Sequence, residues 1–254
     1  MPENPYDNPR FFARYLAMPR SVGGLEAAGE WHVLRRLLPD LRGKRVLDLG
    51  CGLGWHCRYA AEQGARRVVG VDVSARMLAE ARALTTTPLI EYVHRPIEEI
   101  DYPEGAFDVV LSSLALHYVA SFEDVCRKVA RCLVGGGDFV ISVEHPVFTA
   151  RGDQEWHRDA AGNILHWPVD HYFQEGPREA VFLGECGVGV ADVLEFLLQP
   201  GWQVDVLHAH VVTEPDGQRV VELSPVARPT PPRRDFDPPP WAREREDPLF
   251  DPTP

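Results

Sequence analysis

The sequence contains no pair of cysteines at CxxC spacing, and its five cysteines are an odd number. This pattern argues against a disulfide framework and against structural zinc, so we expect reduced thiols and no bound metal. The sequence also has no apolar run of membrane-spanning length, and its first residues, MPENPYDNPRFF, lack the apolar centre of a signal peptide. These absences predict a cytoplasmic protein that does not bind a membrane.

Positive charge is scarce as well. The 254 residues include 26 Lys and Arg against 38 Asp and Glu, which gives a formal net charge of −12. An acidic surface repels phosphate backbones, so nucleic acid is not an expected partner. The phosphate-binding pattern GxxxxGK[ST] is also absent, which argues against a P-loop.

Short apolar segments alternate with amphipathic segments between residues 41 and 144. Strands are predicted at 46–49, 67–73, 89–94, 107–112 and 138–143, with helices at 55–63, from Ser74 onward, and at 122–133. The run Gly135–Gly137 is predicted to end the last of these helices. The alternation predicts an α/β fold with a doubly wound, Rossmann-like parallel sheet and helices on both faces. In such sheets, ligands bind beyond the carboxyl ends of the strands.

Four further segments flank this predicted core. Residues 1–40 are predicted to form a helical N-terminal lid with a break at Gly23 and Gly24, and residues 145–185 an irregular insertion or lid on the substrate side. Residues 186–224 are predicted to hold a helix at 190–198 and a closing strand hairpin that completes the sheet. Residues 225–254 contain ten of the 23 prolines and are predicted to form an extended or disordered tail.

Three glycines follow the first predicted strand in the stretch VLDLGCGLGWH. Glycine adopts positive φ at little cost and lets the backbone approach a ligand closely. Gly50, Gly52 and Gly54 therefore predict a loop that wraps around a small molecule. The dinucleotide pattern GxGxxG fails in both registers, because Trp55 or Cys57 stands at the third glycine position.

A single acidic residue closes the second predicted strand. Asp72 follows Gly50 by 22 residues, where a carboxylate accepts hydrogen bonds from the ribose hydroxyls of a bound nucleoside. This position suits NAD as well as S-adenosylmethionine (SAM), so it identifies a nucleoside without deciding the chemistry.

Four stretches in order, VLDLGCGLGWH, VVGVDVSARMLAEAR, FDVVLSSLALHYV and CLVGGGDFVISVEHP, resemble the motifs of class I SAM-dependent methyltransferases. The chain is most similar to the bacterial small-molecule type, which begins with a YDNPxFFxxY segment, and the similarity runs from about Tyr6 to Glu185. The resemblance implies a seven-stranded sheet with an antiparallel last strand, and SAM as cofactor with S-adenosylhomocysteine (SAH) as product.

The resemblance also implies the cofactor-binding residues. Asp48 belongs to this set, and the three glycines pass beneath the methionine part of SAM, while Asp72 holds the ribose. Val73 and Met77 enclose the adenine, Ser113 and Leu114 flank the sulfonium, and the segment from Tyr6 to Tyr15 closes over the cofactor. Many relatives carry Asp after the third strand to bind the adenine, where this chain has Pro96 in HRPIEEI. The N–H of Ile97 and the carboxylate of Glu98 are the candidates to replace it.

Methyl transfer needs a general base only when the acceptor is an alcohol, a phenol or an acidic carbon. His145 directly follows the fifth predicted strand and His117 follows the fourth, so both are candidate catalytic residues on the acceptor side. The leading hypothesis is a methyltransferase that acts on oxygen, nitrogen or carbon of a small molecule. Two alternatives stay open: a SAM-binding or SAH-binding protein that has lost transfer activity, and an NAD(P)-dependent oxidoreductase. The alternative of a binding protein without activity is based on two departures from the family: Pro96, and the stretch GECGVGVADVLEF, where relatives are basic.

Overall fold

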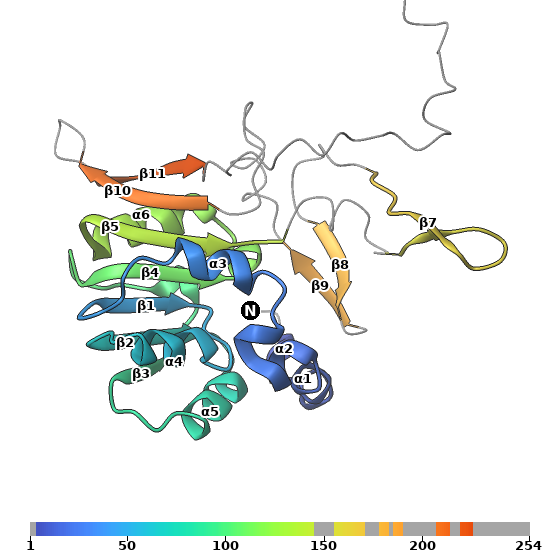
Figure 1. The fold of residues 1–254 in the computed structure, drawn as a ribbon, viewed down its shortest axis with the longest axis horizontal. Coiled ribbons are helices and arrows are strands. Elements are labelled where there is room, and N and C mark those ends of the chain that lie inside the picture. Colours follow the sequence, from blue (N-terminus) through green and yellow to red (C-terminus); the bar gives the residue numbers. More distant parts are fainter. Residues whose placement is uncertain are drawn as a thin grey trace, which may run out of the picture.

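The computed structural model describes residues 4–144, 155–170, 178–182, 185–189, 207–213 and 219–225. Its centre is a seven-stranded sheet with the strand order β11-β10-β5-β4-β1-β2-β3 (Figure 1). The strands of this sheet are β1 (Arg45–Leu49), β2 (Arg67–Asp72), β3 (Ile90–His94), β4 (Phe107–Ser113), β5 (Leu133–Ser142), β10 (Leu207–Thr213) and β11 (Arg219–Pro225).

The first five strands are parallel, with β1 between β2 and β4. Strand order therefore reverses at β1, which makes the carboxyl end of β1 the expected ligand crevice. The predicted α/β class is confirmed. The strand that opposes the parallel body is β10, which pairs antiparallel with β5 and with β11. The last strand, β11, turns back from β10 in the predicted hairpin and occupies the edge of the sheet.

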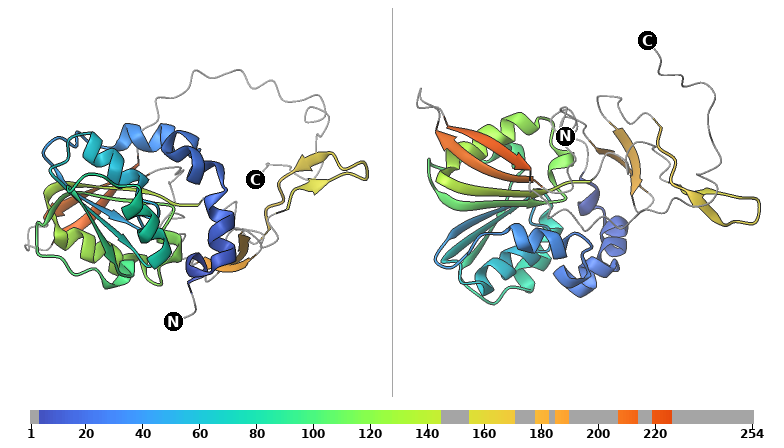
Figure 2. Two further views of the ribbon diagram at one scale, coloured as in Figure 1. Left: turned by 90° about the horizontal axis from the view of Figure 1, so that it is seen from below. Right: turned by 45° about the horizontal axis from the view of Figure 1, so that its top comes forward.

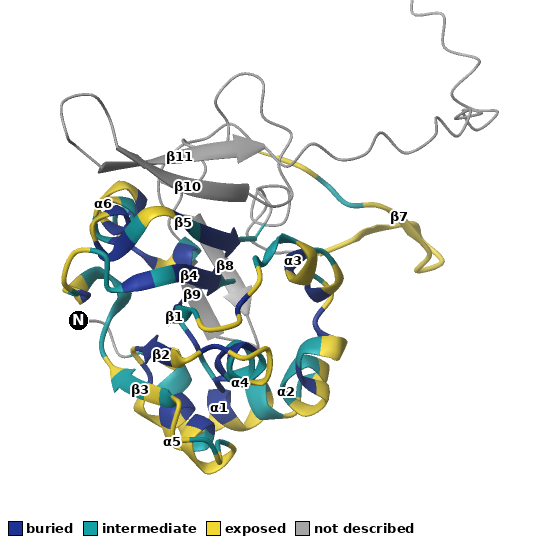
Figure 3. Cartoon of the chain, turned by 60° about the vertical axis from the view of Figure 1, so that its left-hand side comes forward, coloured by how far each residue is buried: buried dark blue, intermediate teal, exposed yellow. Residues whose placement is uncertain are grey.

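Helices cover both faces of the sheet, and buried apolar side chains alternate between them. The helices are α1 (Pro9–Leu16), α2 (Pro19–Gly23), α3 (Trp31–Leu37), α4 (Trp55–Glu62), α5 (Ala75–Ala83) and α6 (Phe122–Cys132), with short 3-10 turns η1 (Pro5–Asp7), η2 (Gly24–Ala27), η3 (Ile97–Glu99) and η4 (Leu116–Tyr118). Side chains of α3, α4 and α5 pack on the face that carries Val46, Val109 and Val140. Helix α6 packs on the other face, against Val110 and Phe139. Because both faces are covered, most residues of β4 and of the second half of β5 are buried, as the dark blue of these strands in Figure 3 shows.

The glycine run 135–137 does not end α6, contrary to the prediction. Helix α6 ends at Cys132, and β5 begins at once with Leu133, so the three glycines lie inside the strand. The pairing of β4 with β5 shifts register here, between Phe107 and Val109. A Cβ atom on Gly137 would lie 3.0 Å from the carbonyl oxygens of Asp108 and Val134. The glycine run thus lies at a β-bulge, where the backbone comes close to Gly137.

Helices α1 and α2 lie beyond the carboxyl ends of the parallel strands, beside the start of α4 and α5 (Figures 1 and 2). Phe12 of α1 packs with Leu53 of the glycine loop and Met77 of α5 in one buried cluster. The carboxylate of Asp7 accepts hydrogen bonds from Ser74 Oγ at 2.7 Å and from Arg76 N at 3.1 Å. The segment that begins the chain is therefore bound to the segment that follows β2.

Two small hairpins follow β5: β6 (His157–Arg158) with β7 (Ile164–His166), and β8 (Arg178–Phe182) with β9 (Glu185–Gly189). Strand β9 lies beside η4, on the side of the sheet's carboxyl ends (Figure 2). The helix predicted at 190–198 and the tail from residue 226 onward lie outside the described residues. Within the described part of the chain, no helix has the length and apolar character needed to cross a membrane.

Candidate active site

The glycine loop leaves β1 at the point where the strand order reverses. Gly50, Gly52 and Gly54 have φ angles of +74°, +51° and +72°, a region that favours glycine. The N–H groups of Gly50 and Cys51 donate to the carbonyl oxygen of Val71, at 2.8 Å and 3.0 Å. These two bonds fasten the loop to the end of β2.

The three glycines have different surroundings. A Cβ atom on Gly50 would overlap the side chain of Ala115, and one on Gly54 would overlap Tyr92 Oη. The Cβ position of Gly52 has no heavy atom within 4 Å. Gly50 and Gly54 are thus required by the protein's own packing, whereas Gly52 faces open space.

Asp72 lies beside this open space. Its Oδ2 accepts a hydrogen bond from Gly52 N at 2.7 Å, and its Oδ1 accepts one from Ser74 N at 2.8 Å. Burial raises the pKa of this carboxyl, and the two N–H donors oppose the rise. Each carboxylate oxygen carries two lone pairs, so both oxygens of Asp72 retain the capacity to accept from a ligand.

Asp48 lies beneath the loop. Its side chain is buried, Cys57 Sγ donates to its Oδ2 at 3.2 Å, and its Oδ1 has no hydrogen-bond partner in the described part of the chain. Burial raises the pKa of Asp48 to about 7, while the Cys57 hydrogen bond opposes the rise and the charge of Asp72 adds to it. The hydrogen bond from Cys57 connects Asp48 of β1 with α4, the helix that follows the loop.

The residues that were predicted to contact the adenine differ in their exposure and in their contacts. Val73 is 41% exposed and follows Asp72 directly, but Met77 is buried against Phe12 and Leu53. Ile97 packs near Gly50, with its Cδ1 at 3.5 Å from the glycine's Cβ position. Glu98 instead makes hydrogen bonds within the protein. Its Oε1 accepts one from Ala120 N at 3.4 Å, and its carbonyl oxygen accepts one from Lys128 Nζ.

Ser113 and Leu114 end β4 on the other side of the loop. Ser113 Oγ shares a hydrogen bond of 2.9 Å with Ser142 Oγ and donates to Glu30 Oε1 at 3.4 Å. Leu114 has a φ of +52°, the only positive value at a non-glycine residue in the described segments. Such strain persists only where the surroundings enforce it, and it is typical of functional sites.

Of the two candidate catalytic histidines, the described residues include only His117, since His145 lies outside them. His117 Nδ1 is buried without a hydrogen-bond partner among the described residues. Burial lowers the pKa of His117 to about 4, so the ring is neutral at neutral pH. The neighbouring Tyr118 shares a hydrogen bond of 3.3 Å with Tyr6 of the N-terminal segment.

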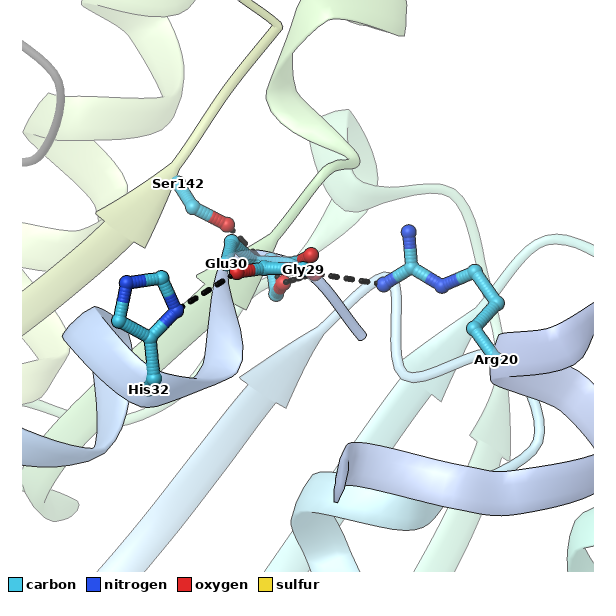
Figure 4. Close-up of polar contacts among 6 residues, drawn as sticks. Arg20, Gly29, Glu30, His32 and Ser142 are labelled. Atoms are coloured by element: carbon cyan, nitrogen blue, oxygen red, sulfur yellow. Dashed lines mark hydrogen bonds and ion pairs between the residues drawn. The ribbon is translucent and has the colours of Figure 1, made fainter. Parts of the chain in front are cut away.

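A pocket between α2, η2 and the glycine loop contains residues that the sequence analysis missed. Arg20, Trp55 and His56 line it together with Gly50–Gly52 and Ser113. Arg20 Nη2 lies 2.6 Å from Glu30 Oε1, and Figure 4 shows this ion pair beside Ser142. Trp55 and His56 had a signal in the sequence, as part of the GLGWH motif, whereas Arg20 and Glu30 belong to no recognisable pattern.

Fold and site together define an α/β protein in which the carboxyl end of β1 has the geometry suited to a nucleoside-containing cofactor. Residues 47–141 match the family model described as a methyltransferase domain. The chain is 50% identical to an assigned SAM-dependent methyltransferase of Listeria monocytogenes, with a TM-score of 0.62, over 78% of this chain and 96% of that one. It is 36% identical to a SAM-dependent methyltransferase of Mesorhizobium loti, with a TM-score of 0.62, over 79% and 98% of the two chains.

The chain belongs to the class I SAM-dependent methyltransferases. It is an enzyme with SAM as its cofactor, which sets aside both the oxidoreductase reading and the reading of a binding protein without activity. An uncharacterized protein of Haemophilus influenzae is 33% identical over 68% of this chain and 71% of that one.

Relatives with a named acceptor match over less than half of their length. A malonyl-[acyl-carrier protein] O-methyltransferase of Enterobacter lignolyticus is 41% identical over 39% of each chain. A tRNA U34 carboxymethyltransferase of Pseudoalteromonas translucida is 37% identical over 61% of this chain and 47% of that protein. The acceptors of these relatives differ in kind, so the family alone leaves the acceptor of this chain open.

The residues present fit SAM. The open Cβ position of Gly52 lies next to a carboxylate that can accept from ribose hydroxyls. On the other side of the loop, Arg20 lines the pocket, and Glu30 contacts two of the lining residues, Arg20 and Ser113. One cationic and one anionic side chain match the charges of an amino-acid group.

Proposed function

We propose that this enzyme transfers the methyl group of SAM to oxygen, nitrogen or carbon of a small molecule. When bound, SAM supplies an electrophilic methyl group on a good leaving group, so the protein's main task is to align the acceptor with it. The observation that carries the cofactor assignment is the Asp72 carboxylate, held by Gly52 N–H at 2.7 Å beside the open Cβ position of the same glycine.

In the proposed site, Gly50, Gly52 and Gly54 form the floor under the cofactor and Asp72 accepts hydrogen bonds from the ribose. Val73 covers the adenine, with Ile97 N–H and Glu98 as further candidates on that side. Met77 acts through packing, since it supports Leu53 and Phe12 from within their cluster. Asp48 is proposed to act on the cofactor indirectly, from its place in β1 before the glycine loop.

His117 is proposed to face the acceptor. Its ring is neutral at neutral pH, and its Nδ1 lacks a partner among the described residues. A pKa of about 4 makes the ring a weak base, which suits an orienting hydrogen bond to the acceptor better than full proton removal. His145 remains the candidate base for an acceptor that must lose a proton.

Charge favours a small molecule over tRNA. Polyanion-binding proteins gain affinity from Lys and Arg that neutralise phosphates, and this chain has a net charge of −12. The similarity to a tRNA-modifying enzyme makes tRNA the alternative to test.

The test measures SAH formation from SAM with small acceptors grouped by reacting atom (amines, phenols, carboxylates, acidic carbons) and with total tRNA. Turnover with a small acceptor and none with tRNA is the expected result, and turnover with tRNA alone would overturn the proposal. The Asp72→Ala variant should raise the KM for SAM at least tenfold. The matched control is Asp101→Ala, an exposed acid paired with Arg131, which should leave it unchanged.

A further inference from the structure

Arg20, which lines the pocket, forms an ion pair with Glu30. The Arg20 and Glu30 side chains are 28% and 21% exposed, and their charged atoms are 2.6 Å apart. Arg20 lines the pocket with the glycine loop, and Ser113 Oγ donates to the same Glu30 oxygen that Arg20 contacts. Figure 4 shows the guanidinium and the carboxylate reaching toward each other from separate segments of the N-terminal region.

Two further polar groups of this pocket lack partners. Ser21 Oγ and Trp55 Nε1 are buried without a hydrogen-bond partner among the described residues, and both side chains line the pocket. A buried donor without a partner is costly, so such donors indicate a ligand that supplies an acceptor. The guanidinium of Arg20 also has five N–H donors, of which the ion pair uses one.

A partly buried ion pair is weak evidence for fold stability, because apolar side chains of similar size stabilise a fold at least as well. Here, however, Arg20 lines the pocket and Glu30 contacts two of its lining residues, Arg20 and Ser113, so the pair brings one positive and one negative group to this pocket. An α-amino acid group carries the complementary charges, and charge-assisted hydrogen bonds of this kind are strong and directional.

We propose that Arg20 and Glu30 recognise the amino-acid end of the cofactor. The guanidinium binds the α-carboxylate, with Ser21 and Trp55 as further donors, and the Glu30 carboxylate accepts from the α-ammonium while Ser113 holds it in place. The inference rests on the proposed site, in which Asp72 holds the ribose at the other end of the same ligand.

The test compares the affinities of SAH and 5′-methylthioadenosine by calorimetry. Methylthioadenosine keeps the nucleoside and the thioether but lacks the amino-acid end. Arg20→Met should weaken SAH binding by about 10- to 100-fold, as expected for hydrogen bonds to charged groups, and should change methylthioadenosine binding less than twofold. Glu30→Gln should follow the same pattern with a smaller loss.

The matched control is Arg45→Met. Arg45 pairs with Asp108 at 2.9 Å, the two side chains are 26% and 18% exposed, and the pair lies at the opposite end of β1. This variant should leave the affinities for both ligands unchanged. Equal weakening of both ligands in Arg20→Met, or unchanged SAH binding, would overturn the inference.

A separate variant distinguishes failure of this inference from failure of the cofactor site itself. Asp72→Ala should weaken SAH and methylthioadenosine alike, because both carry the ribose. If it weakens neither ligand, the ribose assignment is wrong and the inference falls with it. If it weakens both while Arg20→Met spares SAH, only the inference about the amino-acid end is wrong.

Discussion

Gly52 and Gly54 are two positions apart in the glycine loop, yet their side-chain positions meet different surroundings. We predict that Gly52→Ala lowers the free energy of unfolding by only about 1–2 kcal/mol, the cost of positive φ, but strongly weakens SAH binding. Gly54→Ala should lower the free energy of unfolding further, because its Cβ would overlap Tyr92 Oη and overpacking adds about 1–3 kcal/mol. Urea denaturation and calorimetry on the same samples measure both quantities.

The contrast between the two glycine variants is the informative result. If Gly52→Ala binds SAH as well as the unmodified protein does, then the open space at this glycine is not part of the cofactor site. If Gly54→Ala is as stable as Gly52→Ala, the contact with Tyr92 has relaxed at little cost.

The raised pKa of Asp48 leads us to predict that the stability of the protein depends on pH. Burial raises its pKa in the folded protein to about 7, above the value of roughly 4 expected for an unfolded chain. The folded state therefore binds the proton more tightly, so the stability that Asp48 contributes is present below pH 4 and is lost as the pH rises to 7. Three pKa units correspond to a loss on the order of 4 kcal/mol.

The Asp48→Asn variant removes this titration while it keeps the shape of the side chain. We expect the free energy of unfolding of the unmodified protein to fall from pH 5 to pH 8 by clearly more than that of Asp48→Asn, as measured by urea denaturation. Equal pH profiles for the two proteins would show that Asp48 is ionised throughout and that its surroundings solvate the charge.

At the scale of elements, η1 is bound to the N-terminus of α5 through Asp7, whose carboxylate and carbonyl oxygen both accept hydrogen bonds, the latter from Arg76 Nε at 2.8 Å. Asp7 accepts from Ser74 Oγ and from Arg76 N, so it supplements the Ser74 side chain, which accepts from Met77 N at 3.1 Å. A carboxylate at this end of a helix also interacts favourably with the helix dipole.

We predict that Asp7→Ala loosens the N-terminal segment without unfolding the sheet. Amide hydrogens of α1 should exchange at least several-fold faster, as expected when about 1 kcal/mol of capping is lost, while those of β1 and β4 stay protected. Exchange followed by mass spectrometry measures this, with Asp101→Ala as a control at a remote exposed acid. Unchanged exchange in α1 would mean that the apolar cluster around Phe12 alone holds the segment.

The elements that the sequence predicted well are those whose pattern is local. The first four parallel strands and α4 and α6 were placed to within a few residues, because apolar runs and helical spacing follow from burial on one or two faces. The start of β5 was misplaced for the opposite reason. Gly135–Gly137 have the composition of a helix stop, but the close approach of Asp108 to Gly137 makes them a bulge inside a strand. That contact joins residues distant in sequence, and no local pattern contains it.

At the scale of the whole molecule, the candidate site combines four stretches of chain. The glycine loop follows β1, Asp72 ends β2, Ser113 ends β4, and Arg20 and Glu30 come from the N-terminal region. The first three stretches meet because parallel strands share one carboxyl edge. The fourth reaches them because α1 packs on Leu53 and Met77, as Phe12 shows.

The sequence by itself determined the fold class, the glycine loop and the position of Asp72, because each depends on residue types at short, regular spacing. It also determined the acidic charge that disfavours polyanions. Only the tertiary structure decided which glycine faces open space, that the buried Asp48 carboxylate accepts a hydrogen bond from Cys57 of α4, and that Arg20, which lines the pocket, pairs with Glu30. These features depend on contacts between distant segments, and such contacts form only when the packed core brings the segments together.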